Sequence, residues 1–449
     1  MFKQSKYLIK SEVPLQEGND LEDEQKVILF STRTGGTLVV KKKLLKLLEE
    51  REWSKISNYE LQKLIENKVI ICEDEDEEDS IIAFNIADNT ANKSLSMTIQ
   101  LTANCQLGCF YCGQVHSPNK ASKKVVNESI KRVIDKLEKG KYEALHITWY
   151  GGEPLLVVDD IVNYSYKILS FCAKNNIEYT SDIITNGLLL KENTFEKLVG
   201  VGITQYQVTL DGNKDTHDKR RITKKGGKSY EIIKRNIVEI VKSNLYKKSN
   251  SRLNMRINVD KTMAHGISSL IDEIYQEGIL NDINVTFAPV FDWGGNEADK
   301  NSFTPQDFAD MEIEWLLKLL ELGKKDINLI PKVRTSSCMV DNIDSEVHDA
   351  FGNIYACYEY TYTPAYSDKS FLEGNLLNLE KGGRKLSPIR NFKNDILNRT
   401  HSNCIECIFF PVCSGECPKQ WMNGKVPCPS FKFNMGERLL LEYLIKKLY

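Results

Sequence analysis

The segment Leu101-Thr102-Ala103-Asn104-Cys105-Gln106-Leu107-Gly108-Cys109-Phe110-Tyr111-Cys112 holds three cysteines in a short loop that follows an apolar stretch. Thiolates are soft ligands that suit iron–sulfur clusters. A structural zinc site needs four protein ligands, which usually come in two pairs, whereas this loop has three cysteines and no fourth nearby. Three thiolates on a four-iron cluster leave one iron open to bind a cofactor. The spacing therefore favours such a cluster over structural zinc.

A second motif, Trp149-Tyr150-Gly151-Gly152-Glu153-Pro154, ends a strand-like run from residue 144 to residue 150. Glycines let a backbone approach a ligand closely, and a carboxylate can accept a hydrogen bond from an ammonium. The two motifs together resemble the radical S-adenosylmethionine (SAM) enzymes. The resemblance implies a 4Fe–4S cluster on Cys105, Cys109 and Cys112, with SAM on the open iron and its amino group at Gly151, Gly152 and Glu153.

Further positions match the SAM pocket of that family. They are Tyr111, between the second and third cysteines, Asn186 in Thr-Asn-Gly, Thr209 in Val-Thr-Leu-Asp-Gly, and Arg221 twelve residues later. The resemblance implies that Tyr111 lies against adenine, and that Thr209 and Arg221 meet the ribose or carboxylate of SAM. A guanidinium is well suited to a carboxylate, although a surface position for Arg221 is the alternative. We expect His217 to be structural.

The composition limits the class of protein. The chain has 449 residues, 41% of them hydrophobic, and a net charge of -2, so it can hold two or three domains and has no charge suited to nucleic acid. It shows no secretory signal and no apolar run of transmembrane length. Twelve cysteines without a signal favour metal sites in a reducing cytoplasm over disulfides. We therefore expect a cytoplasmic protein with no nucleic-acid or membrane partner.

Residues 93–310 alternate predicted strands and helices. The predicted strands cover residues 96–101, 144–150, 179–185, 206–210, 252–259 and 284–289, and helical stretches include residues 127–139 and 161–175. Such alternation predicts a parallel sheet, and six repeats fit the partial (β/α)6 TIM-like barrel of the resembled family. Functional residues collect at the carboxyl ends of barrel strands. Cys105, Gly151, Asn186 and Asp211 each follow a predicted strand.

Residues 1–92 read as a small separate domain. We predict strands at 26–30 and 37–40 around a turn, a helix at 41–50, and a helix at 58–66 opened by a capping box of Ser57 and Glu60. A strand at 68–72 comes before seven consecutive acidic residues, 73–79, which favour a solvated loop or hairpin tip. A returning strand at 81–84 would complete the hairpin.

This order of elements resembles the winged-helix peptide-recognition domains that are fused to enzymes modifying ribosomally made peptides. In that case a leader peptide would add a strand to an exposed sheet edge. The alternative is a stabilising N-terminal extension without binding function.

The last third of the chain, 311–449, carries seven more cysteines in a fixed pattern. They resemble the cysteine-rich SPASM domain, here with bridging and C-terminal helices, which holds two auxiliary 4Fe–4S clusters. The resemblance assigns Cys404, Cys407, Cys413 and Cys428 to an outer cluster, and it assigns Cys338, Cys357 and Cys417 to an inner one. Three ligands leave the fourth position of the inner cluster open to water, an oxygen ligand or a substrate thiolate. Two four-ligand zinc sites would instead need a non-cysteine partner.

A departure from sulfatase-maturing relatives concerns the catalytic base. Those relatives have an aspartate directly after the cysteine that matches Cys357, and this chain has Tyr358 and then Glu359. A tyrosine is a poor base at neutral pH. The candidates for acid–base chemistry are Tyr358, Glu359 and Asp292.

The sequence thus predicts an α/β radical SAM/SPASM peptide maturase with three 4Fe–4S clusters and SAM. The 5′-deoxyadenosyl radical would take hydrogen from a precursor peptide that carries a leader, and a thioether, carbon–carbon or ether crosslink would form. The electron donor would be of flavodoxin or ferredoxin type. The alternatives are a formylglycine-forming sulfatase maturase, a quinone-cofactor maturase, and a non-catalytic iron–sulfur carrier or zinc protein.

Overall fold

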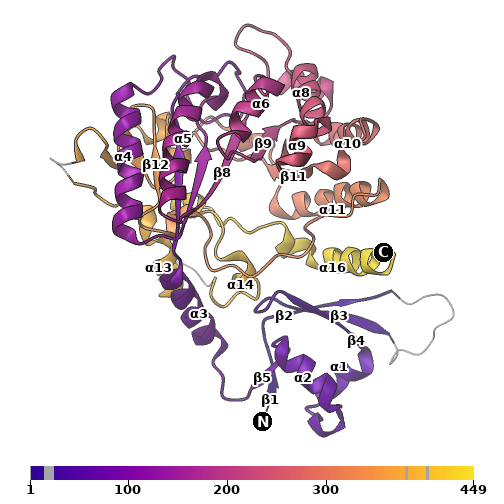
Figure 1. Ribbon diagram of the computed structural model, residues 1–449. Helices are drawn as coiled ribbons and strands as arrows, with labels where there is room; N and C mark the ends of the chain where they lie inside the picture. Colours follow the sequence, from indigo (N-terminus) through magenta and orange to yellow (C-terminus); the bar gives the residue numbers. More distant parts are fainter. Residues whose placement is uncertain (1, 15–24, 380–382, 401–403, 449) are drawn as a thin grey trace.

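The computed structural model describes residues 2–14, 25–379, 383–400 and 404–448. Its largest element is a nine-stranded sheet with the strand order β11-β10-β9-β8-β7-β6-β12-β13-β14. The strands from β6 to β11 pair in parallel, and helices pack around them (Figure 1). The α/β fold with a partial barrel that the alternating pattern predicted is confirmed.

Strands and helices alternate along the barrel region. The strands are β6 (Ser94–Ile99), β7 (Ala144–Trp149), β8 (Glu178–Thr185), β9 (Gln205–Thr209), β10 (Arg252–Val259) and β11 (Asn284–Pro289). The helices are α4 (Lys123–Gly140), α5 (Val158–Lys174), α6 (Glu192–Val199), α7 (Lys214–Arg220), α8 (Tyr230–Lys242), α9 (Asn244–Lys248), α10 (Ile267–Gln276) and α11 (Pro305–Glu321). All six predicted strands form, and β10 and β11 have the predicted bounds.

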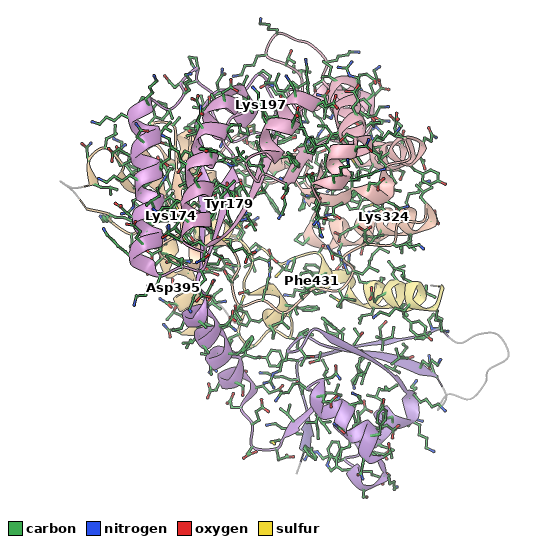
Figure 2. The ribbon with its side chains drawn as sticks, in the orientation of Figure 1. Lys174, Tyr179, Lys197, Lys324, Asp395 and Phe431 are labelled. Carbon is green, nitrogen blue, oxygen red and sulfur yellow. The ribbon has the colours of Figure 1, made fainter. Side chains whose placement is uncertain are left out.

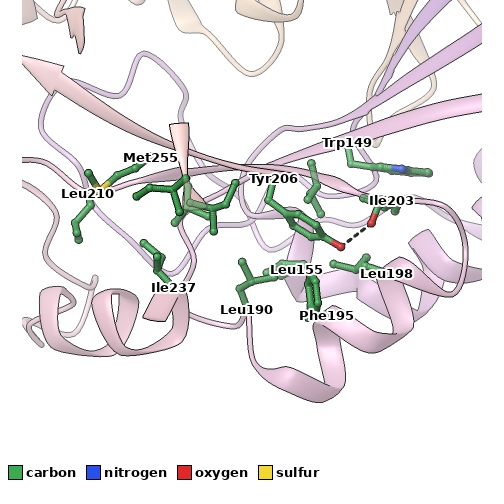
Figure 3. Close-up of a cluster of buried hydrophobic side chains, with 14 of the residues drawn as sticks. Trp149, Leu155, Leu190, Phe195, Leu198, Ile203, Tyr206, Leu210, Ile237 and Met255 are labelled. Carbon is green, nitrogen blue, oxygen red and sulfur yellow. Dashed lines mark hydrogen bonds between the residues drawn. The ribbon is translucent and has the colours of Figure 1, made fainter. Parts of the chain in front are cut away.

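Strand β10 shows why the barrel has two different faces. Its burial alternates along the strand, so Leu253, Met255 and Ile257 are buried while Arg256 and Asn258 are only partly buried. Successive side chains of a strand point to opposite faces of the sheet. The apolar set packs into the main core, and the polar set faces the inside of the barrel. Figure 3 shows part of that core, where the buried Tyr206 hydroxyl donates to the Ile203 carbonyl at 2.6 Å.

The C-terminal region extends the same sheet, which the sequence did not predict. Strand β12 (Glu346–His348) pairs in parallel with β6, and β13 (Asn353–Tyr355) and β14 (Leu372–Asn375) follow antiparallel. The buried Glu346 carboxylate of β12 pairs with Arg132 of helix α4 at 2.7 Å and with His348 of its own strand at 3.0 Å. Strands of three or four residues are too short to show a period in the sequence.

The remaining C-terminal elements are short helices and one long one. They are α13 (Phe392–Leu397), α14 (Phe410–Cys413), α15 (Pro418–Met422) and α16 (Phe431–Leu448). Residue 310, the expected boundary between the barrel and this region, lies inside α11, whose Trp315 and Leu316 belong to the barrel core. A helix packed in this way is part of the barrel. The division of the chain into three domains stays a proposal, and we place its second boundary after α11.

The N-terminal region forms its own small fold (Figure 1). Strands β2 (Leu8–Glu12), β3 (Lys26–Ser31) and β4 (Gly36–Lys41) make an antiparallel sheet, followed by α1 (Lys42–Glu49) and α2 (Asn58–Glu66). The capping box predicted for α2 is present, because the Ser57 side chain accepts from the Glu60 amide and the Glu60 carboxylate accepts from the Ser57 amide. Strand β5 (Ile70–Cys72) pairs with β1 (Phe2–Gln4).

The prediction for the acidic tract was wrong. Residues 77–91 form helix α3 (Glu77–Ala91) in place of a hairpin tip and a returning strand. Asp76 caps this helix by accepting from the amides of Glu78 and Asp79, and three acidic residues occupy its first turn. Negative charge is favourable at a helix N-terminus, and Arg33 pairs with Glu75 at 2.7 Å and with Glu77 at 3.1 Å. The acids therefore start a helix instead of solvating a loop.

No helix among the described residues is long and apolar enough to cross a membrane.

Replacing Ile257 by alanine tests the core side of the barrel. Ile257 on β10 is fully buried, so Ile257→Ala should lower the free energy of unfolding by about 2–5 kcal/mol. Ile257→Val is the matched control and should cost only about 0.5–1.5 kcal/mol. Chemical denaturation followed by circular dichroism measures both, and equal losses in the two variants would contradict the packing described here.

Candidate active site

The three cysteines of the first motif line one cavity at the carboxyl end of β6. Cys105, Cys109 and Cys112 all border this cavity of about 210 Å3. The loop is fixed at both sides by isolated bridges, from Thr102 to Lys120 and from Leu107 to Thr223. One continuous loop therefore presents three thiols to one enclosed space.

The environment of these thiols suits a metal cluster. Burial raises the pKa of the Cys105 thiol to about 12, and the charge of Glu153 adds to the rise. Burial likewise raises the pKa of Cys112 to about 11. Thiols so protected from ionisation in the free protein become thiolates when they bind a metal. Two buried polar atoms of cavity-lining residues, Gln114 Nε2 and Arg221 Nε, have no hydrogen-bond partner among the described residues, which fits a polar ligand beside the cluster.

The arrangement of these cysteines also helps to decide whether they bind an iron–sulfur cluster or a zinc ion. Within the described part of the chain, no three His, Cys, Asp or Glu side chains are grouped to hold a single ion. A tetrahedral zinc with bonds of 2.3 Å would hold its thiolates about 3.8 Å apart. A four-iron cluster binds each thiolate through a different iron, so the thiolates can be further apart. Three thiols on one loop fit a four-iron cluster that keeps one iron open to a ligand.

Gly151 and Gly152 line the approach from strand β7. Both have positive φ, 87° and 54°. A Cβ on Gly152 would lie 2.3 Å from the Asn104 carbonyl oxygen, and a Cβ on Gly151 would lie 2.6 Å from the side chain of Gln100. The Gly152 amide donates to Gln114 Oε1 at 3.1 Å. Only glycine fits this close contact between the β7 end and the cysteine loop.

Most of the hydrogen-bond acceptor capacity of the Glu153 carboxylate is taken up by neighbouring groups of the protein. It accepts from Thr185 Oγ1 at 2.6 Å, from the Asn186 amide at 2.8 Å and from the Leu155 amide at 3.0 Å. A carboxylate has about four acceptor sites, so one remains for a ligand. Burial raises the pKa of Glu153, and these hydrogen bonds oppose the rise. Glu153 thus holds the ends of β7 and β8 together and can still meet an ammonium.

Asn186 connects strand β8 to the cysteine loop. Its side-chain amide donates to Cys105 Sγ at 3.7 Å, and its Oδ1 accepts from the Leu188 amide at 3.0 Å. Thr209 ends β9 and is buried on the same cavity wall. Both expected SAM contacts therefore line the space beside the three thiols.

Tyr111 and Arg221 belong to one buried network. The Tyr111 hydroxyl donates to Asp211 Oδ2 at 2.6 Å, Arg221 Nη1 donates to Tyr111, and Asn258 Nδ2 lies 3.2 Å from the same hydroxyl. Arg221 is 6% exposed, so the surface position is excluded. The sequence did not identify Asn258. The sequence signal that could have found Asn258 is that Asn254, Arg256 and Asn258 are polar residues at every second position of β10.

His217 is structural, as expected. Its Nδ1 accepts from the Asp211 amide at 3.0 Å, and its Nε2 lies 2.9 Å from Ser229 Oγ. Burial and the nearby Arg221 lower the pKa of His217 to about 3. The ring therefore stays neutral and holds the loop after β9.

The C-terminal cysteines fall into two neighbourhoods. Burial, and then the charges of Glu359, Cys338 and Cys417, raise the pKa of the Cys357 thiol, so three of these cysteines are close together. In the other group, Lys432 Nζ lies 3.4 Å from Cys428 Sγ. Although burial lowers the pKa of Lys432, its hydrogen bond to Cys428 and the charges of Cys407, Cys428 and Cys404 raise it. Cys413 interacts with Cys404. The assignment of these cysteines to an inner and an outer cluster stays a prediction.

The three acid–base candidates lie in different places. Tyr358 and Glu359 line the same cavity as the first cysteines, and the Tyr358 ring meets the Tyr150 ring edge to face with 5.1 Å between the ring centroids. Burial raises the pKa of both groups. Asp292 is not among the cavity-lining residues, and its carboxylate accepts from the amides of Gly294, Gly295, Asn296 and Glu297. Asp292 therefore shapes the loop that follows β11.

The sequence analysis did not identify four other residues that line the cavity. Tyr150, Gln207, Arg256 and Trp293 line the same space. Gln207 and Thr209 are two residues apart on β9, as Arg256 and Asn258 are on β10, and the register pairs Arg256 with Thr209. Polar residues at period two on buried parallel strands were a readable signal of an inner barrel face.

Gly152→Ala tests the close contact at the cysteine loop. The new Cβ would collide with the Asn104 carbonyl, so the loop must move. We expect the affinity for SAM to fall about tenfold or more, which is about 1.4 kcal/mol, as measured by calorimetry under anaerobic conditions. Gly278→Ala is the matched control, because Gly278 also has positive φ and nothing lies within 4 Å of its Cβ. Similar SAM affinities in both variants would refute the expected contact.

The neutral His217 predicts how stability depends on pH. The folded protein holds this ring unprotonated down to a pKa of about 3, while the unfolded chain binds the proton near pH 6.5. The unfolded state is therefore favoured as pH falls below about 6.5, by up to about 1.4 kcal/mol per pH unit. His217→Gln should reduce this acid dependence of the melting temperature. An unchanged dependence would show that the ring also protonates in the folded state.

The comparisons with known proteins agree with this geometry. Residues 99–258 match the model of the Radical SAM superfamily. A cysteine-type anaerobic sulfatase-maturating enzyme of Clostridium novyi (strain NT) is 26% identical over 388 residues, which cover 76% of this chain and 94% of that protein. A probable GTP 3′,8-cyclase of Methanococcus aeolicus is 28% identical over 199 residues, 43% of this chain and 60% of that protein.

Solved structures support the fold. The structure titled native anSMEcpe with bound AdoMet matches 79% of this chain and 100% of its own, with a TM-score of 0.54 and 19% identity. The same enzyme with bound AdoMet and the Cp18Cys peptide gives a TM-score of 0.55 at 18% identity. The family match covers the cysteine loop and strands β7 to β10, so this chain is an enzyme that carries a Radical SAM domain over residues 99–258.

Proposed function

We propose that this enzyme modifies a ribosomally made precursor peptide, with SAM and three 4Fe–4S clusters as cofactors. The observation that carries the proposal is the composition of one cavity. Cys105, Cys109 and Cys112 line it together with Tyr358 and Glu359, which directly follow Cys357 in the sequence. A substrate residue in this cavity would lie near the SAM-binding cluster and near a proposed ligand of the inner cluster.

The cofactors would supply the difficult step and the chain would position it. A reduced 4Fe–4S cluster with bound SAM provides a carbon-centred radical that removes hydrogen from an unactivated carbon. Asn186 would donate to the Cys105 sulfur, Gly152 would allow close approach, and Arg221 would bind the SAM carboxylate. Tyr150, Tyr358 and Trp293 would exclude water from the reacting carbon.

Glu359 is our proposed proton acceptor. Its pKa is raised by burial, while the charges of Lys419 and Arg256 oppose that rise. A carboxylate with a raised pKa is a better base near neutral pH than an ordinary one. The Tyr358 hydroxyl is not suited to this role, because burial moves its pKa further above the ordinary value. The inner cluster would accept an electron from the substrate radical.

The N-terminal sheet would bind the leader of the precursor peptide. Strand β4 is the edge of the order β2-β3-β4, and a groove of about 560 Å3 lies between β4, α1 and α2. Lys41, Lys43, Lys55 and Lys63 line the groove with the single acid Glu60. A peptide strand added to β4 would gain main-chain hydrogen bonds, and this charge favours an acidic leader.

Sulfatase maturation is the second candidate. The Clostridium novyi relative, which this chain matches over 94% of its length, supports it. The reaction products distinguish peptide crosslinking from sulfatase maturation. A crosslink removes two hydrogen atoms from the peptide, while a sulfatase maturase converts a cysteine into formylglycine. A quinone-cofactor maturase would be recognised by crosslinked aromatic residues. A carrier without catalytic activity is set aside, since this enzyme carries a Radical SAM domain.

Anaerobic reconstitution tests the cofactor proposal. We expect about twelve irons per chain, the sum of three four-iron clusters, and release of 5′-deoxyadenosine when a reductant and SAM are added. Four irons, or zinc, would leave the auxiliary clusters without support. A flavodoxin- or ferredoxin-type protein should replace the chemical reductant, and a cytoplasmic location follows from that partner.

Glu359→Gln tests the proton acceptor. With precursor peptides encoded beside the gene, the ratio of modified peptide to 5′-deoxyadenosine should fall about 100-fold, as expected for a lost general base. Glu359→Asp is the matched control and should keep part of that ratio. Mass spectrometry of the peptide measures the product, and full product formation by Glu359→Gln would refute the role.

Charge reversal tests the groove. The double variant Lys43→Glu, Lys63→Glu should weaken binding of a synthetic peptide of alternating glutamate and leucine about five- to tenfold, roughly 1–1.4 kcal/mol. Lys174→Glu is the matched control, because Lys174 lies on barrel helix α5, remote from the N-terminal domain (Figure 2). Fluorescence anisotropy at two salt concentrations gives the affinities. Equal effects of both variants would show nonspecific binding.

A further inference from the structure

Strand β3 of the N-terminal domain is covered on both faces. Val27 and Leu29 pack into that domain's own core with α1 and α2. Ile28 and Phe30 pack instead against Phe409, Val412, Met435 and Leu439 of the C-terminal region. Figure 1 shows α14 and α16 lying directly over β2 and β3. The N-terminal sheet is therefore held as the middle layer between its own helices and the outer cysteine loop.

Hydrogen bonds fix the same contact. The Tyr7 hydroxyl, fully buried, donates to the Ile405 carbonyl at 2.6 Å, and Thr32 Oγ1 donates to the Ile408 carbonyl at 2.5 Å. These two carbonyls lie between cysteines of the proposed outer cluster, Ile405 after Cys404 and Ile408 after Cys407. A third bond joins Ser11 Oγ to the Gly436 carbonyl of α16 at 3.1 Å.

The loop that accepts these bonds has little regular structure of its own. From residue 404 to residue 409 its backbone makes single turns, such as the Cys407 amide to the Cys404 carbonyl at 2.9 Å and the Phe410 amide to the Cys407 carbonyl at 2.9 Å. Loops built around cysteine ligands take their shape from the bound metal. The direction of the Ile405 and Ile408 carbonyls would then depend on the cluster.

The outer cysteines do not border the reaction cavity. Its described lining includes none of Cys404, Cys407, Cys413 and Cys428, whereas it includes Tyr358 and Glu359 beside the inner group. Phe409, which packs with Ile28 and Phe30 of β3, also contacts Phe431 at the start of α16, with 6.0 Å between the ring centroids. Figure 2 labels Phe431.

We infer that the outer cluster acts as the docking base of the N-terminal domain, so that this domain is held more loosely when that cluster is lost. The inference rests on the proposed ligand set of the outer cluster. If that domain captures the leader, an enzyme that has lost the outer cluster would no longer present its peptide to the cavity.

The test uses the full chain, reconstituted without oxygen. Cys404→Ser, Cys407→Ser should remove about four irons, increase the radius of gyration, and speed tryptic release of the N-terminal domain at least tenfold. Cys338→Ser, Cys357→Ser is the matched control. It should remove the same amount of iron from the inner group and leave both the radius of gyration and the digestion rate as in the parent protein.

A second variant separates docking from misfolding. Tyr7→Phe, Thr32→Val removes the two hydrogen bonds to the loop and keeps every cysteine. It should retain the parent iron content and still digest several-fold faster. Unchanged digestion in Cys404→Ser, Cys407→Ser, equal loosening in the inner-cluster control, or no loss of iron would each overturn the inference. None of these readouts depends on catalysis, so a failure of the proposed peptide modification would appear separately.

Discussion

The parallel, in-register pairing of β6 through β10 brings the site together. Because all these strands run in one direction, the loops that follow them meet at one edge of the sheet. The cysteine loop follows β6, the glycine motif follows β7, Asn186 follows β8 and Asp211 follows β9. Glu153 then joins two of these ends directly, through the Thr185 hydroxyl and the Asn186 amide. Without that convergence, residues separated by more than a hundred positions could not border one cavity.

The C-terminal region completes the site because it is built into the same sheet. Strand β12 extends the barrel beside β6, and the segment after β13 places Tyr358 and Glu359 in the lining of the cavity. Buried ion pairs of Glu346 with Arg132 and Lys136 keep this extension in place. Breaking one partner of such a buried pair leaves a charge without compensation and is strongly destabilising. These ion pairs therefore help to hold the strand that precedes Tyr358 and Glu359 against the barrel.

Strongly periodic elements were predicted well, and short or charge-dominated ones were not. Strands β10 and β11 and helix α2 form with the predicted bounds, because their apolar period or capping residues act locally. The prediction for the acidic tract failed because two contacts favour a helix there. Arg33, distant in sequence, pairs with Glu75 and Glu77, and Asp76 caps the helix. The sequence analysis did not predict strands β12 to β14, because a strand of three or four residues is too short to show the alternation of buried and exposed residues. The inner barrel residues Arg256 and Asn258 were readable from alternation, but the predicted site was built from motifs alone.

The sequence by itself determined the kind of chemistry, since cysteine spacing and the glycine motif are local patterns that limit which metal group and ligand can bind. It also determined where the barrel strands lie along the chain, because period and turn residues act over a few positions. The tertiary structure alone decided that Arg221 is buried beside Tyr111, that Asp292 shapes a loop, and that the N-terminal sheet lies against the outer cysteine loop. These depend on contacts between residues far apart in the chain, whose burial and partners no local pattern encodes.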